Sequence, residues 1–211
     1  YSKSIDNIRS LTNFESVIRT NSFFNSGFAD ETFSARGRFQ RTFKKIRASI
    51  DGNFNYSKFN QFVQGQRTLN ESYNQTYRAE LRTNFRDAPN IEIGYSYRIQ
   101  DVDQGSNRNK FFTNTPSIEF DAYIWKKFTF RTDYSYNNFS NEEGTLNEFQ
   151  FWNASLSYRK DQDAKFEYIL NATNILDTKS QNQSSNSAIS VAAQEYIIQP
   201  RYVTFRLRYE L

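Results

Sequence analysis

The sequence has no cysteine, no histidine and no methionine among its 211 residues. Without cysteine it can form neither a disulfide nor a thiolate metal site. Without histidine it can build neither a serine–histidine triad nor an imidazole metal site, which excludes most familiar hydrolases. Glycine (7) and proline (3) are also scarce, so the composition is not that of a disordered, Pro/Gly-rich chain.

Long apolar runs are absent as well, since no segment approaches the ~18 consecutive apolar residues of a transmembrane helix. The mean hydropathy is −0.83, yet Phe, Tyr and Trp make up 18% of the residues, with 21 Phe and 14 Tyr. A chain that is polar on average but rich in aromatics fits a structure in which only alternate residues face an apolar environment.

The charges are nearly balanced, with 27 Lys and Arg against 23 Asp and Glu, a net charge of +4. The arginines are spread along the chain rather than clustered, so we predict no nucleic-acid partner. Paired carboxylates such as Glu119 and Asp121 remain possible catalytic groups, but nothing marks either as an acid with a raised pKa. We therefore predict that the chain is not an enzyme, with no catalytic residue, no metal site and no cofactor.

The C-terminal stretch RYVTFRLRYEL shows the dominant pattern of the sequence. Every second residue from Val203 to Leu211 is apolar, and the residues between them include Arg206, Arg208 and Glu210. A period of two residues is that of a β-strand with one apolar and one polar face.

The same period recurs upstream and predicts ten strands. They are 31–43, 46–57, 73–85, 91–100, 117–124, 128–137, 152–159, 166–172, 190–199 and 201–211. The facing of the strand at 190–199 stays undecided, and Pro200 is taken as the last turn. Short connections (44–45, 87–90, 125–127, 160–164 and near 200) alternate with longer ones (61–72, 102–113, 140–147 and 176–189).

Strand length, loop asymmetry and the placement of aromatics favour an all-β, antiparallel transmembrane β-barrel of the bacterial outer membrane. Ordinary strands have ~5–6 residues, whereas tilted membrane strands need roughly 9–11. Aromatics gather near both ends of the expected strands, as in the two girdles that bracket a bilayer. The outer set is Tyr56, Tyr73, Tyr97, Tyr136 and Trp152, and the turn set is Phe43, Phe85, Trp125, Phe128 and Phe166. A soluble antiparallel sandwich is the alternative.

Two motifs add a family resemblance. The ending resembles the C-terminal assembly signal of outer-membrane barrels through Phe205, Leu207, Tyr209 and Leu211, although the usual last residue is Phe. NATNILDT at 171–178 resembles the N-L-F-D turn in the late strands of TonB-dependent receptors. The stretch 196–211, with its Gln-Pro-Arg-aromatic turn, is similar to the end of the related outer membrane β-barrel family.

The resemblance implies that residues 31–211 are about ten C-terminal strands of a probably 22-stranded barrel, and that residues 1–30 are an extracellular loop region. It implies nutrient uptake as part of a TonB-dependent outer-membrane transporter. The alternatives are a non-transporting barrel that serves as a scaffold or subunit of a larger complex, and a small ten-stranded pore in which 31–43 pairs with 203–211.

The partners implied are outer-membrane lipid, a missing N-terminal plug and barrel half, the barrel-assembly machinery, a surface lipoprotein and the TonB energy complex. Eight arginines are the predicted lumen-facing residues, through which a polar or anionic solute would be bound; cross-strand charge pairs and plug contacts are the alternative role. The eight are Arg36, Arg38, Arg78, Arg82, Arg98, Arg131, Arg206 and Arg208.

Overall fold

The protein is all-β. The computed structural model describes residues 1–4, 8–15, 18–25, 30–63, 65–86, 89–105, 108–161, 163–187 and 190–210. In these residues every regular element is a strand, and the pairings are antiparallel except for a short parallel contact between two of the strands. A helix suited to crossing a membrane is not found in the described part of the chain.

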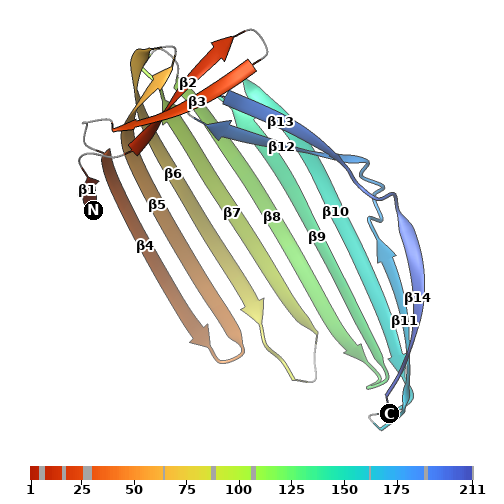
Figure 1. Cartoon of the computed structure of the whole chain (residues 1–211). Helices are drawn as coiled ribbons and strands as arrows, with labels where there is room; N and C mark the ends of the chain where they lie inside the picture. Colours follow the sequence, from red (N-terminus) through yellow and green to blue (C-terminus); the bar gives the residue numbers. More distant parts are fainter. Residues whose placement is uncertain are drawn as a thin grey trace.

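Most of the chain forms one sheet whose main strands follow each other in chain order (Figure 1). These strands are β4 Asp30–Phe43, β5 Ile46–Val63, β6 Gln66–Thr83, β7 Asn90–Asp103, β8 Arg108–Ile124, β9 Phe128–Asn141, β10 Gly144–Arg159, β11 Phe166–Thr173 and β14 Tyr202–Tyr209. We call the end with the turns after β4, β6, β8 and β10 the lower end, and the opposite end the upper end.

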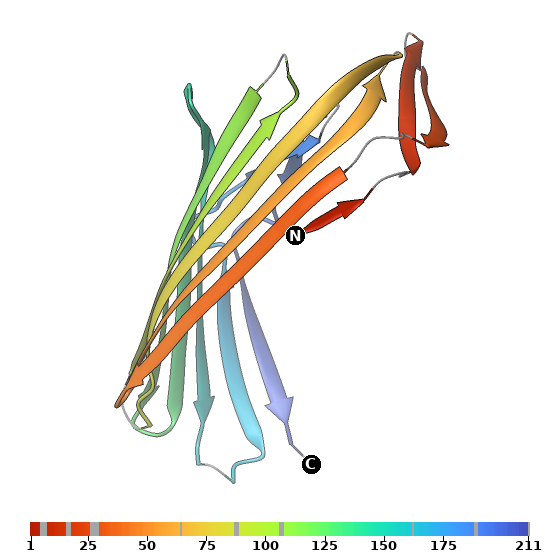
Figure 2. The ribbon, with the colours of Figure 1, turned by 90° about the vertical axis from the view of Figure 1, so that its left-hand side faces the viewer.

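The first 30 residues, predicted to be a loop region, contain three strands. β1 (Ser2–Ser4) pairs with the start of β4. β2 (Ile8–Glu15) and β3 (Ile18–Asn25) form a hairpin that joins the upper end of β5 through two residue pairs. Figure 2 shows this red hairpin standing beside the upper ends of the main strands.

The register of the sheet keeps the two-residue pattern in phase from strand to strand. Phe39 lies opposite Ile50, and Ile50 lies opposite Ala79 on the next strand. At the other side of the sheet, Leu156 lies opposite Leu170, which lies opposite Phe205. Because neighbouring side chains across a ladder share a face, the apolar positions form one continuous face and the polar positions form the other.

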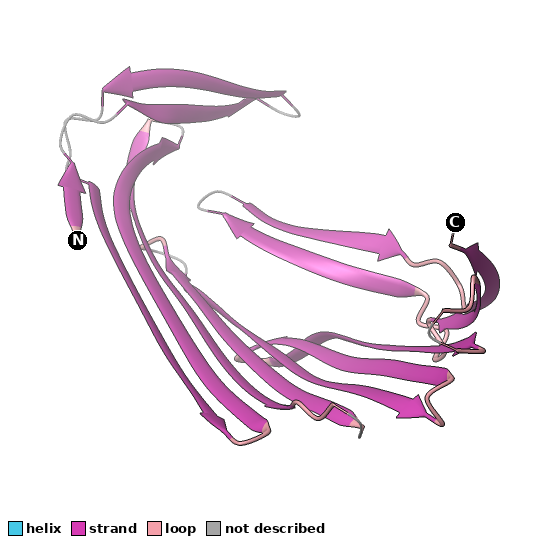
Figure 3. Ribbon diagram, turned by 90° about the horizontal axis from the view of Figure 1, so that it is seen from below, coloured by secondary structure: helices cyan, strands magenta, loops and turns pink. Residues whose placement is uncertain are grey.

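The sheet is curved into a trough, as the view from below shows (Figure 3). One open hollow of about 440 Å³ is lined by Arg131, Asn153, Asn171 and Thr204, which come from four neighbouring strands. These residues alternate with the apolar ones, so the polar face is the concave face. The apolar face is therefore the convex one.

The predicted strand at 190–199 is not part of the main sheet, which corrects the expected strand order. β13 (Ser190–Ile197) pairs with β12 (Ser180–Ser187) in a separate two-stranded sheet, and β11 pairs directly with β14. This hairpin, which we call the strap, crosses the concave side of the trough (Figures 1 and 3). The main sheet thus has nine consecutive main strands from β4 to β14 rather than ten, with β1, β2 and β3 added at its upper end, and β14 ends at the lower end.

Three of the predicted long loops are also wrong. Much of 61–72, 102–113 and 140–147 continues the strands, and the connections there are short. The polar residues at the upper end break the apolar period, but the backbone ladder continues beyond it. The asymmetry between the two ends lies in how far the strands extend past the apolar face.

The described residues do not close a barrel. β14 pairs with β11, and β4 pairs with β5 and, at its first residues, with β1. All steps from β4 to β14 are antiparallel, and there are eight of them, so these two edge strands run in the same direction. The antiparallel pairing of 31–43 with 203–211 that a ten-stranded pore requires is therefore not formed.

Buried apolar side chains are very few. Of the residues whose burial the structure describes, only Phe111 and Ala122 are buried apolar residues. By contrast, Phe39 is 64% exposed, Ile50 61% and Phe205 67%. The sheet therefore has no hydrophobic core of its own over this part of the chain, and what holds it together is backbone pairing with side-chain contacts between neighbouring strands.

Candidate functional site: the charged concave face and the apolar convex face

The eight arginines predicted to face a lumen all lie on the concave face, because each shares the parity of the polar positions in the register. Four of them form ion pairs and four do not. The four without an ion pair to a described residue are Arg78, Arg98, Arg131 and Arg206. The structure therefore separates the eight arginines into an ion-paired group and a group without ion pairs, a distinction that the sequence did not predict.

On the side of β4, one carboxylate holds two of these arginines. Asp51 Oδ1 lies 3.7 Å from Arg36 Nη2, and Asp51 Oδ2 lies 3.5 Å from Arg38 Nε. Farther toward the lower end, Arg82 Nη1 lies 3.3 Å from Glu92 Oε2. These are cross-strand pairs on a partly exposed surface, where each contributes at most about 1 kcal/mol.

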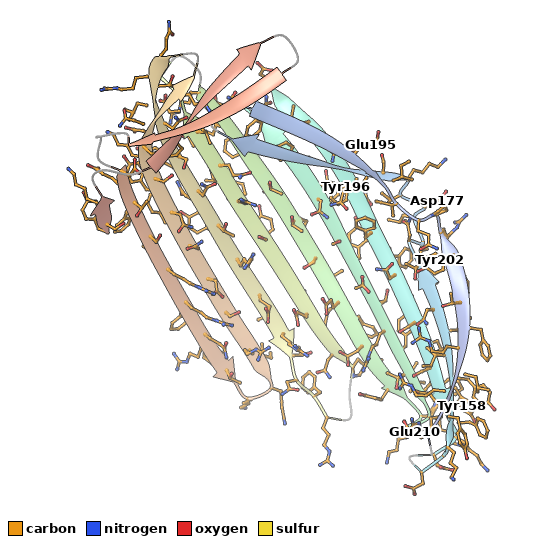
Figure 4. The ribbon with its side chains drawn as sticks, in the orientation of Figure 1. Tyr158, Asp177, Glu195, Tyr196, Tyr202 and Glu210 are labelled. Carbon is orange, nitrogen blue, oxygen red and sulfur yellow. The ribbon has the colours of Figure 1, made fainter. Side chains whose placement is uncertain are left out.

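At the lower end, Arg159 and Glu167 form the centre of a tighter cluster. Glu167 Oε2 lies 3.0 Å from Arg208 Nη1 and 3.5 Å from Arg159 Nη2. Arg159 also donates two hydrogen bonds to the Glu210 carboxylate, at 2.7 and 3.2 Å. These hydrogen bonds lower the pKa of Glu210, which follows the last residue of β14. The cluster joins β10, β11 and the end of β14; Figure 4 places Glu210 there.

Between these groups the concave face carries a row of acids. Glu92 lies opposite Glu119, and Glu119 lies opposite Asp133. Asp121 and Arg131 lie opposite each other one step farther down, without an ion pair between them, and line the same open hollow of about 670 Å³. No group of three or more acidic residues in the described part of the chain is arranged to hold a metal ion.

In the sequence, the oxygen-bearing residues at 101–107 are spaced like those of a loose Ca²⁺ loop. In the structure, the first carboxylate of this segment, Asp101, is bound by Arg108. Asp101 is buried and accepts two hydrogen bonds from Arg108, at 2.9 and 2.6 Å. Asp103 Oδ1 accepts the backbone N–H of Gly105 at 2.8 Å. A guanidinium and an amide therefore take up these oxygens, which makes the segment an ion-paired turn among its described residues.

The convex face has a sharp upper border made by tyrosine hydroxyls. Tyr134 and Tyr136 donate to Gln150 Oε1 at 2.9 Å and to Glu148 Oε2 at 2.8 Å. Tyr95 donates to Asn114 Oδ1 at 2.7 Å. Each ring lies on the apolar face while its hydroxyl reaches a polar side chain, the arrangement that suits an interface between an apolar and an aqueous phase.

Above this border the convex face becomes charged. Tyr56 and Tyr73 pack with ring centres 4.9 Å apart, and one step higher Lys58 Nζ lies 2.9 Å from Glu71 Oε1. Lys3 Nζ lies 3.3 Å from Glu31 in the same upper region. The apolar face therefore ends well below the upper ends of the strands.

The lower border consists of aromatics that carry cations. The Arg41 guanidinium lies 4.7 Å from the ring centre of Phe43, and Lys165 Nζ lies 5.7 Å from that of Tyr209. Trp125, 82% exposed in the lower turn, packs edge-on against Phe128. A long cationic side chain beside an aromatic ring is stable at such a border because its stem is apolar and its head is solvated.

The predicted C-terminal signal residues Phe205, Leu207 and Tyr209 lie on the convex face and are exposed. Leu211 lies outside the described residues. Phe205 contacts Tyr168, and Tyr209 packs against Phe166 with ring centres 5.0 Å apart.

The sequence reasoning missed one residue that joins several elements, Asn174. It is buried, and its side chain binds the start and the end of the segment that carries the strap. The NATNILDT stretch drew notice as a motif, but no periodicity marks a single turn residue as the anchor.

We compared the chain with protein-family models, curated proteins and solved structures, and found no match.

Proposed function

We propose that this chain is the C-terminal barrel portion of a TonB-dependent-receptor-like transporter for nutrient uptake in the bacterial outer membrane. One observation carries the proposal: the convex face is continuous, apolar and without protein cover in the described residues. Exposed apolar patches on soluble monomers are usually no larger than a few hundred Å². An uncovered face that spans nine strands fits lipid as its solvent.

The height of the apolar band supports the membrane assignment. On β5 the convex face is apolar from Ile46 to Tyr56, ten residues apart. Ten steps of ~3.3 Å span about 33 Å along a strand. A strand tilted by ~40° converts this to roughly 25 Å, which is the height of the apolar band of outer-membrane barrels.

The strand count supports a larger barrel. β4 and β14 run in the same direction, so only an odd number of further antiparallel strands can join them. Bacterial outer-membrane barrels have an even number of strands, and nine strands plus an odd number is even. The 22-stranded barrel implied by the resemblance leaves thirteen strands to be supplied, which satisfies this condition. Copies of this chain in one orientation would meet through parallel seams, so they do not satisfy it.

The concave face would then line the passage. Most of its acids pair with arginines, and the unpaired Arg131 and Arg206 line one hollow together with Asn153, Asn171 and Thr204. Guanidinium groups without a carboxylate partner are available to bind a polar or anionic solute.

Two measurements test the proposal. The protein purified from its native membrane is run on a gel heated and unheated, and we expect a heat-modifiable band several times larger than 25.0 kDa. A band at 25 kDa would contradict the larger barrel. A plug and energy-coupling segment in the remaining sequence would support transport, and their absence would favour the scaffold alternative.

The second measurement scans β5 with a polarity-sensitive dye on single introduced cysteines, from Ile46 to Tyr56, in lipid vesicles. We expect a nonpolar signal at even positions and a water-like signal at odd positions, because the two sets occupy opposite faces. A water-like signal at both sets would rule out lipid as the cover of the convex face.

A further inference from the structure

The strap leaves the sheet through a turn that is unusually well bonded. Asn174 is 2% exposed and adopts a left-handed backbone conformation with φ 53°. Its Nδ2 donates to the backbone oxygens of Thr178 at 2.8 Å and Gln199 at 3.0 Å. Its Oδ1 accepts the backbone N–H of Thr178 at 2.9 Å. One side chain therefore joins the residues before and after the strap.

The same turn is tied to the neighbouring strand β10. The backbone N–H of Ile175 donates to Trp152 O at 2.8 Å, and the backbone N–H of Asn174 donates to Asn153 Oδ1 at 2.9 Å. The Thr178 hydroxyl donates to the carbonyl oxygen of Gln150. These three bonds, two from backbone N–H groups and one from a hydroxyl, hold the turn against residues 150–153 in the middle of β10.

Asp177 closes the turn from the other side. It too is left-handed, with φ 56°, and its Oδ1 accepts the backbone N–H of Arg201, just before β14. Asn and Asp tolerate this conformation better than other side chains do. In Figure 4, Asp177 lies where the strap joins the sheet, and Glu195 and Tyr196 lie on the strap itself.

Beyond its base the strap is held by little. Its first strand, β12, touches β10, and no other main strand is in contact with β12 or β13 within the described residues. It nevertheless crosses the concave side of the trough in both views that show it (Figures 1 and 3). Its direction must therefore be set at the base, where the hydrogen bonds are concentrated.

We propose that Asn174 is the positioning residue of the strap: it locks the strap's base to β10 and to the start of β14, so that the strap is a fixed partition that narrows the space over the concave face. The strap does not act as a freely moving lid. From Ser180 to Gln194 it carries no charged residue, and ten of the fifteen residues are Ser, Asn or Gln.

The role of the strap as a partition rests on the proposed function, because it refers to the passage of a solute. The position of the strap can be tested without measuring transport. Distances between paired spin labels are measured on the full polypeptide, without other reactive cysteines, in detergent and in lipid vesicles. Ser34→Cys on β4 marks the far wall of the trough. Ser190→Cys marks the tip of the strap, where Ser190 pairs with Ser187, and Lys179→Cys marks its base.

We expect the tip-to-wall distance to be shorter than the base-to-wall distance, with a narrow distribution. Asn174→Gly keeps the left-handed backbone accessible and removes the side chain, so it should at least double the width of the tip-to-wall distribution. Asn171→Ala, which removes the same amide three residues earlier, should leave the width unchanged. Within the described residues, the Asn171 side chain makes a single long hydrogen bond of 3.5 Å, to Thr204 Oγ1.

Cleavage by chymotrypsin at Tyr196 gives a second readout, with a rise of about tenfold expected for Asn174→Gly. If Asn174→Gly does not fold, Thr178→Val removes only the hydrogen bond from the Thr178 hydroxyl to Gln150 O. This variant should also widen the tip-to-wall distribution. A broad distribution in the unchanged protein, or no widening in either variant, overturns the proposal. Either result would leave the gel and dye tests of the membrane assignment unaffected.

Discussion

The convex and concave faces are made by alternate residues of the same strands, yet their side chains differ in kind: apolar on the convex face, charged and polar on the concave face. On the convex face, apolar side chains have no cover, and order appears at the borders, where tyrosine hydroxyls and cations meet polar groups. On the concave face, acids and arginines neutralise one another across the strands. The register keeps the apolar and the polar side chains on separate faces, and a slip of one residue in any strand would exchange the two faces of that strand.

The largest expected effect separates the two faces directly. Ile50→Arg places a charge inside the apolar band, and Gln40→Arg places one at the same height on the opposite face, since Phe39 faces Ile50 and Gln40 faces Ser49. We expect Ile50→Arg to cost ~2–4 kcal/mol in unfolding from lipid vesicles, as arginine does near the midplane of outer-membrane barrels. Gln40→Arg should cost less than about 0.5 kcal/mol, within the range of surface changes. Equal costs would contradict the assignment of the faces.

A smaller effect tests whether concave charges stabilise by pairing. Glu167→Gln removes the carboxylate shared by Arg159 and Arg208 and should cost roughly 1 kcal/mol in the same unfolding assay. Glu119→Gln is the matched control, because Glu119 lies opposite Glu92 and Asp133. Relief of like-charge repulsion should make it neutral or stabilising by a few tenths of a kcal/mol. The same sign for both variants would refute pairing as the organising principle of this face.

The upper border of the convex face is tested by a hydroxyl deletion. Tyr136→Phe removes the donor to Glu148 and should cost about 0.5–1 kcal/mol, the net value of one hydrogen bond. Tyr168→Phe is the comparison, because Tyr168 lies inside the band and makes ring contacts with Tyr158 and Phe205. We expect no loss there. A larger loss at Tyr168 than at Tyr136 would place the border elsewhere.

The smallest effect concerns pH at the lower end. The pKa of Glu210 is lowered below its ordinary value of 4.5 by the Arg159 hydrogen bonds. A lowered folded-state pKa means that this contribution to stability is present above pH 4.5 and is lost as the pH falls below it. The difference in stability between the unchanged protein and Glu210→Gln should therefore shrink between pH 5 and pH 3. A difference that stays constant over this range would exclude the Arg159–Glu210 pair as its source.

Periodicity predicted much of the sheet, and its failures have physical reasons. The strands at 31–43, 46–57 and 128–137 were predicted because apolar and polar residues alternate in them almost without a break. The upper extensions of β5 and β6 were missed because the two-residue period breaks there: Phe59, Phe62 and Val63 do not follow one parity in the sequence. A ladder stabilised by backbone hydrogen bonds leaves no mark on the side-chain pattern.

The C-terminal region shows the limit most clearly. Ser190–Gln199 lacked a decidable facing, and the structure places β13 outside the main sheet, paired with β12. The jump from Thr173 to Tyr202 is a long-range pairing that no local pattern encodes. With β13 outside the main sheet, the number of main strands changes from an even ten to an odd nine. β14 therefore finishes at the lower end rather than the upper end. A closed antiparallel barrel would then need an odd rather than an even number of further strands.

The amino-acid sequence by itself determined which residues share a face, because a strand alternates its side chains whatever its neighbours are. It also excluded histidine- and cysteine-based chemistry. Only the tertiary structure decided which strands are neighbours, which arginines keep a carboxylate partner, and where the strap leaves the sheet. These depend on register and on contacts such as Asn174 with Gln199, between residues that are distant in the chain and meet only after the ladder has formed.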